Sequence, residues 1–471
     1  MSLPTEGATG PLAYLDKRTY RRQSLENMAE KYDYDLIVVG SGSGGLSAAK
    51  TARDLGKRVA IAEKQHVGGT CVNRGCIPTK LMVYAAEFAI SAQIESDYGW
   101  SVQQREFDWS KFRQAMNSHV QSIRKSQIEG LEGIDLLRGQ AEFTDEHTMS
   151  IDGNSISGEF VLLSVGARPK MPDLPGIEYA LDSRDVFDLE TLPKLLTIVG
   201  GGYIGVELAQ VFHYYGCKVK IVDSKPHVLD GFDEQLQKRV RKTLEDDGIK
   251  VVDGARLKEI EKTDDGFSVT LDNDTTEEAT QVICALGREA NIDTLNLDAV
   301  SVTTNKGKIV VDEYKRTEAD NIFAVGDCTD TVLLTPVAIA EGEAAVKTMF
   351  GNAQKVDYRW IPSAVYIHPE VASVGPTEEE AKEQNIRFET RCTSFTPLKY
   401  GMAESKSIEA FIKLLVNPDT KEIISLHLLA PRAADMTQML VPALKKGLTL
   451  EELQETIPVH PSTGEELFCI E

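Results

Sequence analysis

Near the start of the chain, apolar runs lead directly into clusters of glycine. Residues 34–39 form an apolar run that predicts a buried strand, and the small and apolar residues of 46–55 have the spacing of a helix. Gly56 ends this helix, and a second apolar run at 58–63 predicts another strand. The pattern therefore predicts a strand–turn–helix–strand unit whose turn is the glycine-rich segment 40–45.

The same pattern returns further along the chain. Residues 195–199 predict a strand, which runs into the glycine-rich segment 200–205. A helix is expected over 206–215, with a break at Gly216, and another strand over 218–223. Two such units predict two Rossmann-like nucleotide-binding domains, and hence an α/β fold.

The pattern changes again from about residue 357. Strand-like stretches at 363–367, 410–416 and 422–428 alternate with a helical segment at 433–446, and no glycine fingerprint occurs among them. Runs of strands with a helix at the side predict a separate C-terminal α+β domain.

Composition and charge narrow the class of protein. A chain of 471 residues exceeds what one hydrophobic core organises, which agrees with several domains. No apolar run is long enough to span a membrane, and the N-terminus lacks a signal-peptide pattern, so we expect a cytoplasmic protein without a membrane partner. The net charge of −22 repels phosphate backbones and argues against nucleic acid as a partner.

The first glycine cluster matches the fingerprint of a dinucleotide-binding turn. Gly40 allows the tight turn, Gly42 lets a pyrophosphate approach the backbone, and Gly45 lets the helix pack closely on the sheet. The N–H groups at the start of the helix then face the phosphates. Glu63, at the end of the second strand, is placed to accept hydrogen bonds from a ribose diol.

The second cluster repeats the fingerprint with Gly200, Gly202 and Gly205. Its acidic residue is Asp223, whose carboxylate favours the free 2′-hydroxyl of NAD and repels the 2′-phosphate of NADP. No arginine stands in segment 224–230, although Lys225 and His227 leave NADP open. NAD(H) is therefore favoured over NADP(H).

Cys71 and Cys76 are the only two of the seven cysteines that lie close together in sequence. Four intervening residues, on a turn leading into a helix, let the two sulfurs meet as a disulfide, and the helix dipole and Arg74 favour a thiolate. Two structural cysteines or half of a metal site are the alternatives. No second cysteine pair exists, so no metal site is expected.

Segment 68–80 resembles the redox-active disulfide segment of the class I pyridine nucleotide–disulfide oxidoreductases, which include glutathione reductase, dihydrolipoamide dehydrogenase and mercuric reductase. Further resemblances follow in family order. Segments 164–169 and 285–291 resemble the two crossovers between the nucleotide domains, and 317–327 resembles the second FAD motif. Residues 460–465 resemble the C-terminal H-P-x-x-x-E motif of the family.

The resemblance implies a division of the chain into domains. An N-terminal extension at 1–33 precedes an FAD-binding domain made of two segments, 34–167 and 289–356. An NAD(P)-binding domain at 168–288 lies between these segments, and a dimerisation domain follows at 357–471.

The resemblance also assigns site residues. Cys76 is expected to face the flavin of FAD and Cys71 to attack the substrate disulfide, with an ion pair of Lys80 and Glu207 beside the flavin and Tyr203 gating the nicotinamide pocket. Further cofactor contacts are expected at Gly69, Thr70, Lys80, Gly166, Gly287, Arg288, Gly326 and Asp327.

The C-terminal motif carries the expected acid–base chemistry. A histidine near a dithiol can move protons between thiols, and a carboxylate orients its imidazole, so His460 and Glu465 are predicted to act together. In the family this pair comes from the other subunit, which implies a homodimer.

Two branches of the family compete. Segments 334–339 and 395–399 resemble glutathione reductase, whereas Asp223 and Gly205 resemble the NAD-using branch that includes dihydrolipoamide dehydrogenase. We therefore expect an NAD(P)H-dependent reductase of a small thiol disulfide such as glutathione disulfide, with Arg74 available for a substrate carboxylate. Dihydrolipoamide dehydrogenase is the alternative, and a flavin diaphorase, transhydrogenase or oxidase is a third.

Overall fold

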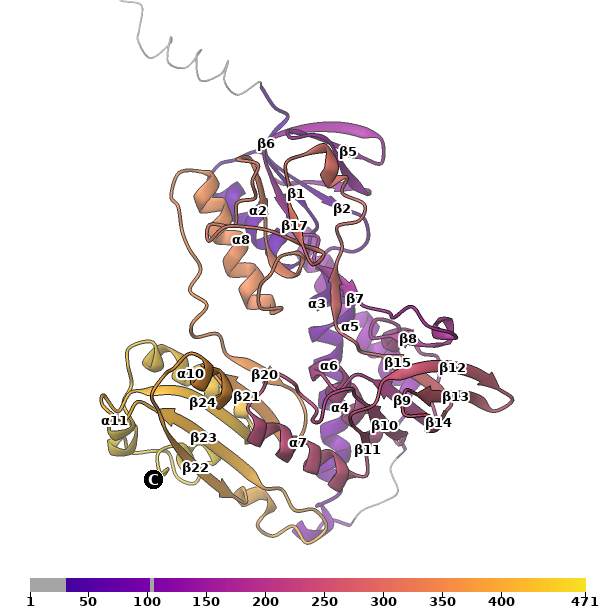
Figure 1. Cartoon of the computed structure of the whole chain (residues 1–471), viewed down its shortest axis with the longest axis vertical. Coiled ribbons are helices and arrows are strands. Elements are labelled where there is room, and N and C mark those ends of the chain that lie inside the picture. Colours follow the sequence, from indigo (N-terminus) through magenta and orange to yellow (C-terminus); the bar gives the residue numbers. More distant parts are fainter. Residues whose placement is uncertain (1–30, 102–105) are drawn as a thin grey trace, which may run out of the picture.

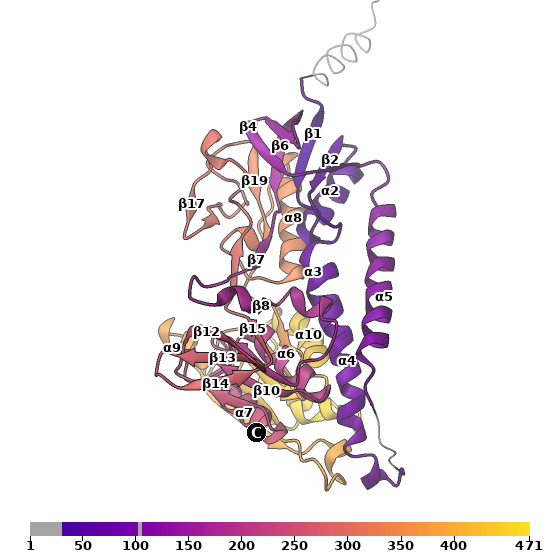
Figure 2. The same ribbon diagram turned by 90° about the vertical axis from the view of Figure 1, so that its right-hand side faces the viewer.

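The computed structural model describes residues 31–101 and 106–471, so the predicted extension at 1–33 lies almost wholly outside the described residues. Three bodies surround a column of helices: α3 (Gly69–Arg74), α4 (Cys76–Ala92) and α5 (Trp109–Glu129) (Figure 1). Helices α4 and α5 run side by side along the long axis of the molecule (Figure 2). The column connects the first body to the other two.

A sheet with a parallel core forms the first body, at the top of Figure 1. Its strand order is β3-β2-β1-β6-β5-β4, with β19 paired to β6. The strands are β1 (Tyr34–Val39), β2 (Val59–Glu63), β3 (Asp135–Arg138), β4 (Ala141–Asp145), β5 (Thr148–Ile151), β6 (Asn154–Leu163) and β19 (Ile322–Ala324). Helices α2 (Ser43–Asp54) and α8 (Thr335–Met349) pack against each other and bury the apolar residues of β1 and β2.

Helix α2 begins at Ser43, earlier than the predicted residue 46. Its first turn contains Gly44 and Gly45, and glycine has a low helix propensity. A Cβ atom on Gly44 would lie 3.0 Å from the Ala338 carbonyl oxygen of α8. Close packing of α2 on α8 therefore requires Gly44, and this contact is not visible in the local sequence. Gly45 is required for another reason, because a Cβ atom there would lie 2.1 Å from the Gly40 carbonyl oxygen.

The second body has a parallel sheet of strand order β11-β10-β9-β15-β8. Its elements are β8 (Leu181–Asp182), β9 (Leu195–Val199), β10 (Lys218–Val222), β11 (Lys250–Val252), β15 (Gln281–Cys284), α6 (Tyr203–Tyr214) and α7 (Glu234–Asp247). A three-stranded antiparallel sheet packs against it and comprises β12 (Leu257–Thr263), β13 (Gly266–Leu271) and β14 (Thr276–Ala279).

The two predicted crossover segments lie side by side. Strand β7 (Ala167–Pro169) pairs antiparallel with β16 (Arg288–Ala290), and Arg288 stands opposite Pro169. The chain thus leaves and re-enters the first body through one two-stranded ribbon.

The C-terminal body is an antiparallel sheet of order β20-β21-β24-β23-β22. It consists of β20 (Ser363–Val365), β21 (Glu370–Val374), β22 (Glu389–Phe395), β23 (Ala410–Val416) and β24 (Ile423–Ala430), with α9 (Glu378–Glu383), α10 (Ala433–Leu444) and α11 (Leu450–Glu455). Strand β23 is buried at every position, because Ile412 faces α10 and α11 whereas Phe411 faces the second body. This sheet therefore joins the second body firmly to the C-terminal body.

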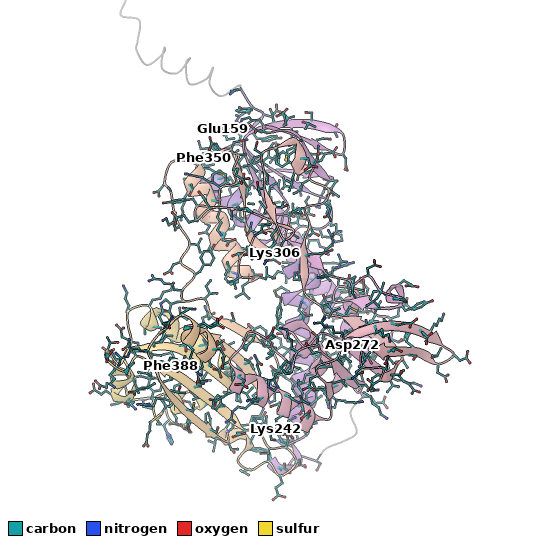
Figure 3. All side chains as sticks on the ribbon, in the orientation of Figure 1. Glu159, Lys242, Asp272, Lys306, Phe350 and Phe388 are labelled. Carbon is teal, nitrogen blue, oxygen red and sulfur yellow. The ribbon has the colours of Figure 1, made fainter. Side chains whose placement is uncertain are left out.

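The α/β class with two Rossmann-like units and a C-terminal α+β body is confirmed. Charged side chains such as Lys242 and Asp272 lie on the outer surfaces of the lower bodies (Figure 3). The exact bounds that the sequence assigns to each domain stay a prediction.

Candidate active site

Gly75 separates the two helices that carry the cysteine pair. Cys71 lies inside the short helix α3, and Cys76 is the first residue of α4. A Cβ atom on Gly75 would lie 2.9 Å from the Thr70 carbonyl oxygen, so this corner is built around a glycine. The sequence places both cysteines on a turn, but the structure puts Cys71 in a helix of its own. Both are free thiols in this structure.

The two thiols shift each other's pKa in opposite directions. A hydrogen bond from Cys76, assisted by the Thr335 hydroxyl, lowers the pKa of Cys71 to about 6, although burial opposes this shift. The same hydrogen bond and burial raise the pKa of Cys76. The pair therefore ionises once near neutral pH, and thiolate is the reactive form of cysteine. Thr335, at the start of α8, lies 3.8 Å (Oγ1) from Cys76 Sγ.

Arg74 lies at the end of α3 and forms an ion pair with Asp188. The guanidinium and carboxylate are 3.2 Å apart, and the influence of Arg74 on the Cys71 thiol stays a prediction. Because exposed ion pairs of this kind are weak, Arg74 can still exchange Asp188 for another carboxylate.

The first glycine turn fits the pyrophosphate and ribose of a dinucleotide. Gly40 has φ +98°, and a Cβ atom on Gly45 would lie 2.1 Å from the Gly40 carbonyl oxygen. Gly42 caps α2 without any side-chain hydrogen bond, which leaves the N–H groups of the first helical turn available to phosphate. Glu63 is buried and accepts hydrogen bonds from the Ser41 N–H (2.9 Å) and hydroxyl (2.6 Å), which fix its carboxylate beside this turn.

Gly69 and Thr70 lie on α3 across from the same turn. A Cβ atom on Gly69 would lie 2.7 Å from Gly42 Cα, so α3 approaches the turn as closely as two glycines allow. Asn73 ties this segment down by donating to the carbonyl oxygens of Val67 and Gly69.

The predicted second FAD motif is held by a buried carboxylate. The Gly326 N–H donates to Glu341 Oε2 at 2.7 Å, and Gly326 has φ +72°. Glu341 Oε1 accepts from three further donors, Lys315, Thr331 and Tyr358. Asp327 pairs with Arg288 at 3.5 Å, and burial raises the pKa of Asp327. These contacts fix the turn from which Asp327 projects.

Two predicted glycines stand on the crossover segments. Gly166 and Gly287 have φ values of +64° and +94°, and a Cβ atom on either would meet no atom within 4 Å. Glycine is thus required at both positions by the left-handed backbone conformation. The space beside the chain at both positions is open.

The second glycine turn is similar but more open. Gly200 has φ +112°, and a Cβ atom on Gly205 would lie 1.9 Å from the Gly200 carbonyl oxygen. A Cβ atom on Gly202 would meet nothing within 4 Å. Asp223 accepts from the N–H groups of Gly201 and Lys225, and Tyr203, the first residue of α6, is 42% exposed.

Lys80 and Glu207 do not form the predicted ion pair in the described part of the chain. Lys80 Nζ lies 3.4 Å from Glu370 Oε1 and 3.8 Å from the centroid of the Tyr366 ring. Glu207 accepts from the Tyr366 N–H at 2.7 Å instead. Three further members of the site are not predicted by the sequence: Glu370, Tyr366 and Thr335.

His460 and Glu465 lie together near the C-terminus. His460 Nδ1 is 2.8 Å from Glu465 Oε2, and the imidazole is 80% exposed. Ser462 and Glu465 form a capping box that fixes the carboxylate. Within residues 31–101 and 106–471, no hydrogen bond joins His460 to Cys71 or Cys76 of the same chain.

Comparison with known proteins identifies the family. The family model described as pyridine nucleotide-disulphide oxidoreductase matches residues 34–342. The chain belongs to this family. The model for the family's dimerisation domain matches residues 361–468 of this oxidoreductase.

Glutathione reductases are among the similar proteins. The oxidoreductase is 35% identical to that of Nostoc sp. over 457 residues, which cover 93% of this chain and 99% of the relative. It is 37% identical to that of Yarrowia lipolytica (94% and 100% covered) and 37% identical to the chloroplastic/mitochondrial enzyme of Pisum sativum (95% and 84% covered).

The predicted enzyme class is confirmed by these matches. The protein is an NAD(P)H-dependent flavoprotein disulfide oxidoreductase that uses FAD and a pyridine nucleotide. The dimerisation domain and the relatives support a homodimer that acts on a small disulfide.

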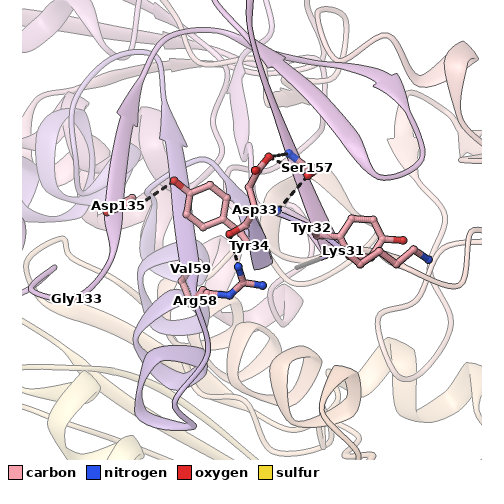
Figure 4. A pocket seen from close by; sticks show the side chains of 9 residues that line it. All are labelled: Lys31, Tyr32, Asp33, Tyr34, Arg58, Val59, Gly133, Asp135 and Ser157. Atoms are coloured by element: carbon pink, nitrogen blue, oxygen red, sulfur yellow. Dashed lines mark hydrogen bonds between the residues drawn. The ribbon is translucent and has the colours of Figure 1, made fainter. Parts of the chain in front are cut away.

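Other features of the described residues lie away from this site. No helix among them is long and apolar enough to cross a membrane, and no group of three or more potential ligand side chains is arranged to hold a metal. A hollow of about 690 Å³ lies beside the N-terminal ends of β1 and β2, lined by residues such as Tyr34, Arg58 and Asp135 (Figure 4). Tyr34 donates to Asp135 and Arg58 donates to the Asp33 carbonyl oxygen, so these polar groups are already paired.

Proposed function

We propose that this oxidoreductase uses NADH to reduce the disulfide of a small thiol of the glutathione type. The observation that carries the proposal is the Cys71–Cys76 pair of free thiols at the junction of α3 and α4, which stands beside α8 and the first glycine turn. The names of the relatives support the substrate class.

The residues of the first body are proposed to hold FAD. The two sets of contacts are the glycine turn with Glu63 and the Gly326–Asp327 turn, joined by Gly69, Thr70, Gly166, Gly287 and Arg288. When bound, FAD supplies the transfer of an electron pair from the nicotinamide to the cysteine pair. Asp223, Tyr203 and the glycines of the second turn are proposed to hold the nicotinamide nucleotide.

The chain's own sulfurs are proposed to carry the second half of the reaction. The Cys71 thiolate attacks one sulfur of the substrate disulfide, forms a mixed disulfide and releases the first thiolate. The partner subunit's His460, oriented by its glutamate, protonates that leaving thiolate. Cys76 then passes its proton to the partner subunit's His460 and attacks Cys71 Sγ, which re-forms the protein disulfide and releases the second thiolate. The partner subunit's His460 protonates this thiolate as well, so two electrons and two protons reach the substrate.

The loop after β10 supports NADH as the electron donor. The Asp223 carboxylate stands where a 2′-phosphate would carry like charge. Lys225 is already paired with Asp230 at 3.2 Å, so the adjacent cation is partly neutralised. Dihydrolipoamide dehydrogenase is the second candidate, because the same carboxylate is typical of NAD-using enzymes.

A cytoplasmic location also stays a prediction.

Anaerobic titration of the purified yellow protein tests the proposal. NADH should reduce the protein with two electrons, produce a long-wavelength charge-transfer band and expose two additional thiols to a chromogenic disulfide reagent. NADPH should do so at much higher concentration. A flavin that bleaches without the band or the new thiols would overturn the disulfide mechanism. Turnover with oxidised glutathione, bis-γ-glutamylcystine and lipoamide then distinguishes the substrates.

A further inference from the structure

A fully buried ion pair lies behind the turn that is proposed to hold FAD. Glu341 on α8 is 0% exposed, and the Lys315 ammonium group lies 2.8 Å from its Oε1 atom. Lys315 is 6% exposed, and its backbone has a φ of +69°, which is unfavourable for a residue other than glycine. None of the proposed reaction steps uses this pair, so its burial indicates another role.

Glu341 accepts hydrogen bonds from two parts of the chain. On one side, the Gly326 N–H donates to Oε2 at 2.7 Å and the Thr331 hydroxyl donates to Oε1 at 2.6 Å, so the segment that follows β19 is held at two points. On the other side, the Tyr358 hydroxyl donates to Oε1 at 2.5 Å. With Lys315, four donors converge on one buried carboxylate, which is as many as its two oxygens can accept.

Tyr358 belongs to the linker 350–362, which leads from α8 to β20. This linker runs from the first body down to the C-terminal body (Figure 1). The centroid of the Tyr358 ring lies 4.9 Å from the Lys315 ammonium group, so the linker contacts both members of the buried pair. Lys355 of the same linker forms only an exposed ion pair with Glu313, and such pairs contribute little to stability. Tyr358 therefore joins the linker to a buried part of the first body.

The charge on Glu341 makes these hydrogen bonds strong. Burial raises the pKa of Glu341, but Lys315, Thr331 and Tyr358 outweigh burial and hold its pKa below the ordinary value. The carboxylate is therefore ionised, and a hydrogen bond to an ionised group is stronger than one between neutral groups. A carboxylate that lacks the Tyr358 donor is held less firmly, and so is the Gly326 N–H that donates to it.

We propose that Glu341 is a positioning residue that couples the FAD-binding turn to the linker, so that bound FAD holds Tyr358 in place and the attached linker raises the affinity for FAD. The inference rests on the proposed function, which assigns FAD to the turn of Gly326 and Asp327. Coupling of this kind is reciprocal. The factor by which FAD stabilises the attached linker equals the factor by which the attached linker increases the affinity for FAD.

Trypsin cleavage of the full-length protein, with and without FAD, tests the proposal. Trypsin can cut after Lys355 and Arg359, which flank Tyr358 and have exposed side chains. In the wild type, FAD should slow cleavage at these two sites about fivefold or more, because cleavage requires the linker to detach. In Tyr358→Phe, FAD affinity should fall about fivefold or more, and FAD should no longer protect the two sites. The fluorescence of released FAD measures the affinity, and mass spectrometry of the peptides measures the cleavage.

Two substitutions serve as matched controls. Tyr314→Phe makes the same change at a tyrosine whose ring faces Lys355 instead of the buried pair. Glu313→Gln removes the exposed carboxylate that pairs with Lys355 of the linker. Both variants should keep the FAD affinity and the protection of the wild type. Glu341→Gln should lose more of both than Tyr358→Phe, because it also leaves Lys315 buried without an anion.

The protection factor compares one variant with and without FAD, so a general loss of stability does not imitate the expected result. Equal cleavage of the wild type with and without FAD would overturn the proposal, as would unchanged protection and affinity in Tyr358→Phe, or the same losses in Tyr314→Phe. If Glu341→Gln does not fold, Tyr358→Phe still decides, because it removes a single hydroxyl.

The same measurements separate this inference from the proposed function. FAD affinity is measured without substrate or nicotinamide nucleotide, so a protein that fails to reduce glutathione-type disulfides can still show the coupling. A wild-type protein that binds no FAD would overturn both proposals, whereas one that binds FAD without protecting the linker would overturn the coupling alone.

Discussion

The two glycine turns have nearly the same backbone but different surroundings. Each begins with a glycine of positive φ, Gly40 or Gly200, and in each the third glycine packs against the carbonyl oxygen of the first. Each leads into a twelve-residue helix without a side-chain cap. The local rules for binding a diphosphate are thus satisfied equally in both.

The difference lies in what covers the turn. Gly42 of the first turn lies directly against Gly69 of α3, whereas the space beside Gly202 of the second turn is open. Glu63 is buried and held by Ser41, but Asp223 borders the exposed segment 224–226. A covered turn suits a cofactor that remains bound, and an open one suits a nucleotide that must enter and leave in each cycle.

The largest expected effect on activity comes from a substitution in α3, the helix that covers the first turn and carries Cys71. Cys71→Ser removes the attacking sulfur but leaves both turns intact. We expect disulfide reductase activity to fall by about a thousandfold or more, while NADH-driven reduction of an artificial acceptor persists. Steady-state rates with the two acceptors measure this. Parallel loss of both activities would mean that the variant had damaged the cofactor sites.

Glycine substitutions compare the covered and the open turn directly. Gly69→Ala puts a Cβ atom 2.7 Å from Gly42 Cα at a φ of +58°, so the helix must move away from the turn. FAD affinity should fall by about tenfold or more, a cost of at least ~1.4 kcal/mol. Fluorescence of released FAD measures this loss.

Gly202→Ala is the matched control for that substitution. Its Cβ atom meets no protein atom within 4 Å, so FAD affinity should stay at the wild-type level while NADH binding weakens. Equal loss of FAD in both variants would contradict the distinction between a covered and an open turn.

Both turns can be predicted from the sequence because their signals are local. An apolar strand, spaced glycines and a terminal acid lie within one short segment, and the structure places strands β1, β2, β9 and β10 close to the expected bounds. The start of α2 is not predicted correctly, because Gly44 belongs to a contact with α8, far away in sequence.

Side-chain partners were harder to predict for the same reason. Lys80 and Glu370 are 290 positions apart, and no spacing rule connects them. The resemblance directed attention to Glu207, which in this structure is bound by a backbone N–H. Arg74 likewise pairs with Asp188, which α3 approaches only in the folded chain. The sequence around Cys71 therefore gives no sign of this partner.

Loss of the negative charge at Asp223 and at Glu63 should affect the binding of different nucleotides. Asp223→Asn keeps an oxygen acceptor for the loop but removes the repulsion of a 2′-phosphate, so the preference for NADH over NADPH should fall about tenfold. The ratio of kcat/KM for the two nucleotides measures it. Glu63→Gln should weaken FAD binding and leave that ratio unchanged; a shift in the ratio would show that the two sites are not independent.

The smallest expected effect is on stability and concerns the ion pairs between the second body and the C-terminal body. Lys413 of β23 pairs with Asp233 at the start of α7 (2.6 Å) and with Glu378 of α9 (2.7 Å). Hydrogen bonds from Lys382 and Lys413 lower the pKa of Glu378 to about 2. A carboxyl whose pKa is depressed in the folded state stabilises the fold above its ordinary pKa, and this stabilisation is lost as pH falls from about 4.5 toward 2.

Glu378→Gln should therefore lower the free energy of unfolding by about 1 kcal/mol at pH 7, because Asp233 still pairs with Lys413. The difference from wild type should shrink as the pH falls through that window, which denaturant unfolding at several pH values measures. The first glycine turn lies in another body, so FAD retention at pH 7 should not change. A difference from wild type that is constant over pH would mean that Glu378 acts through packing and not through its charge.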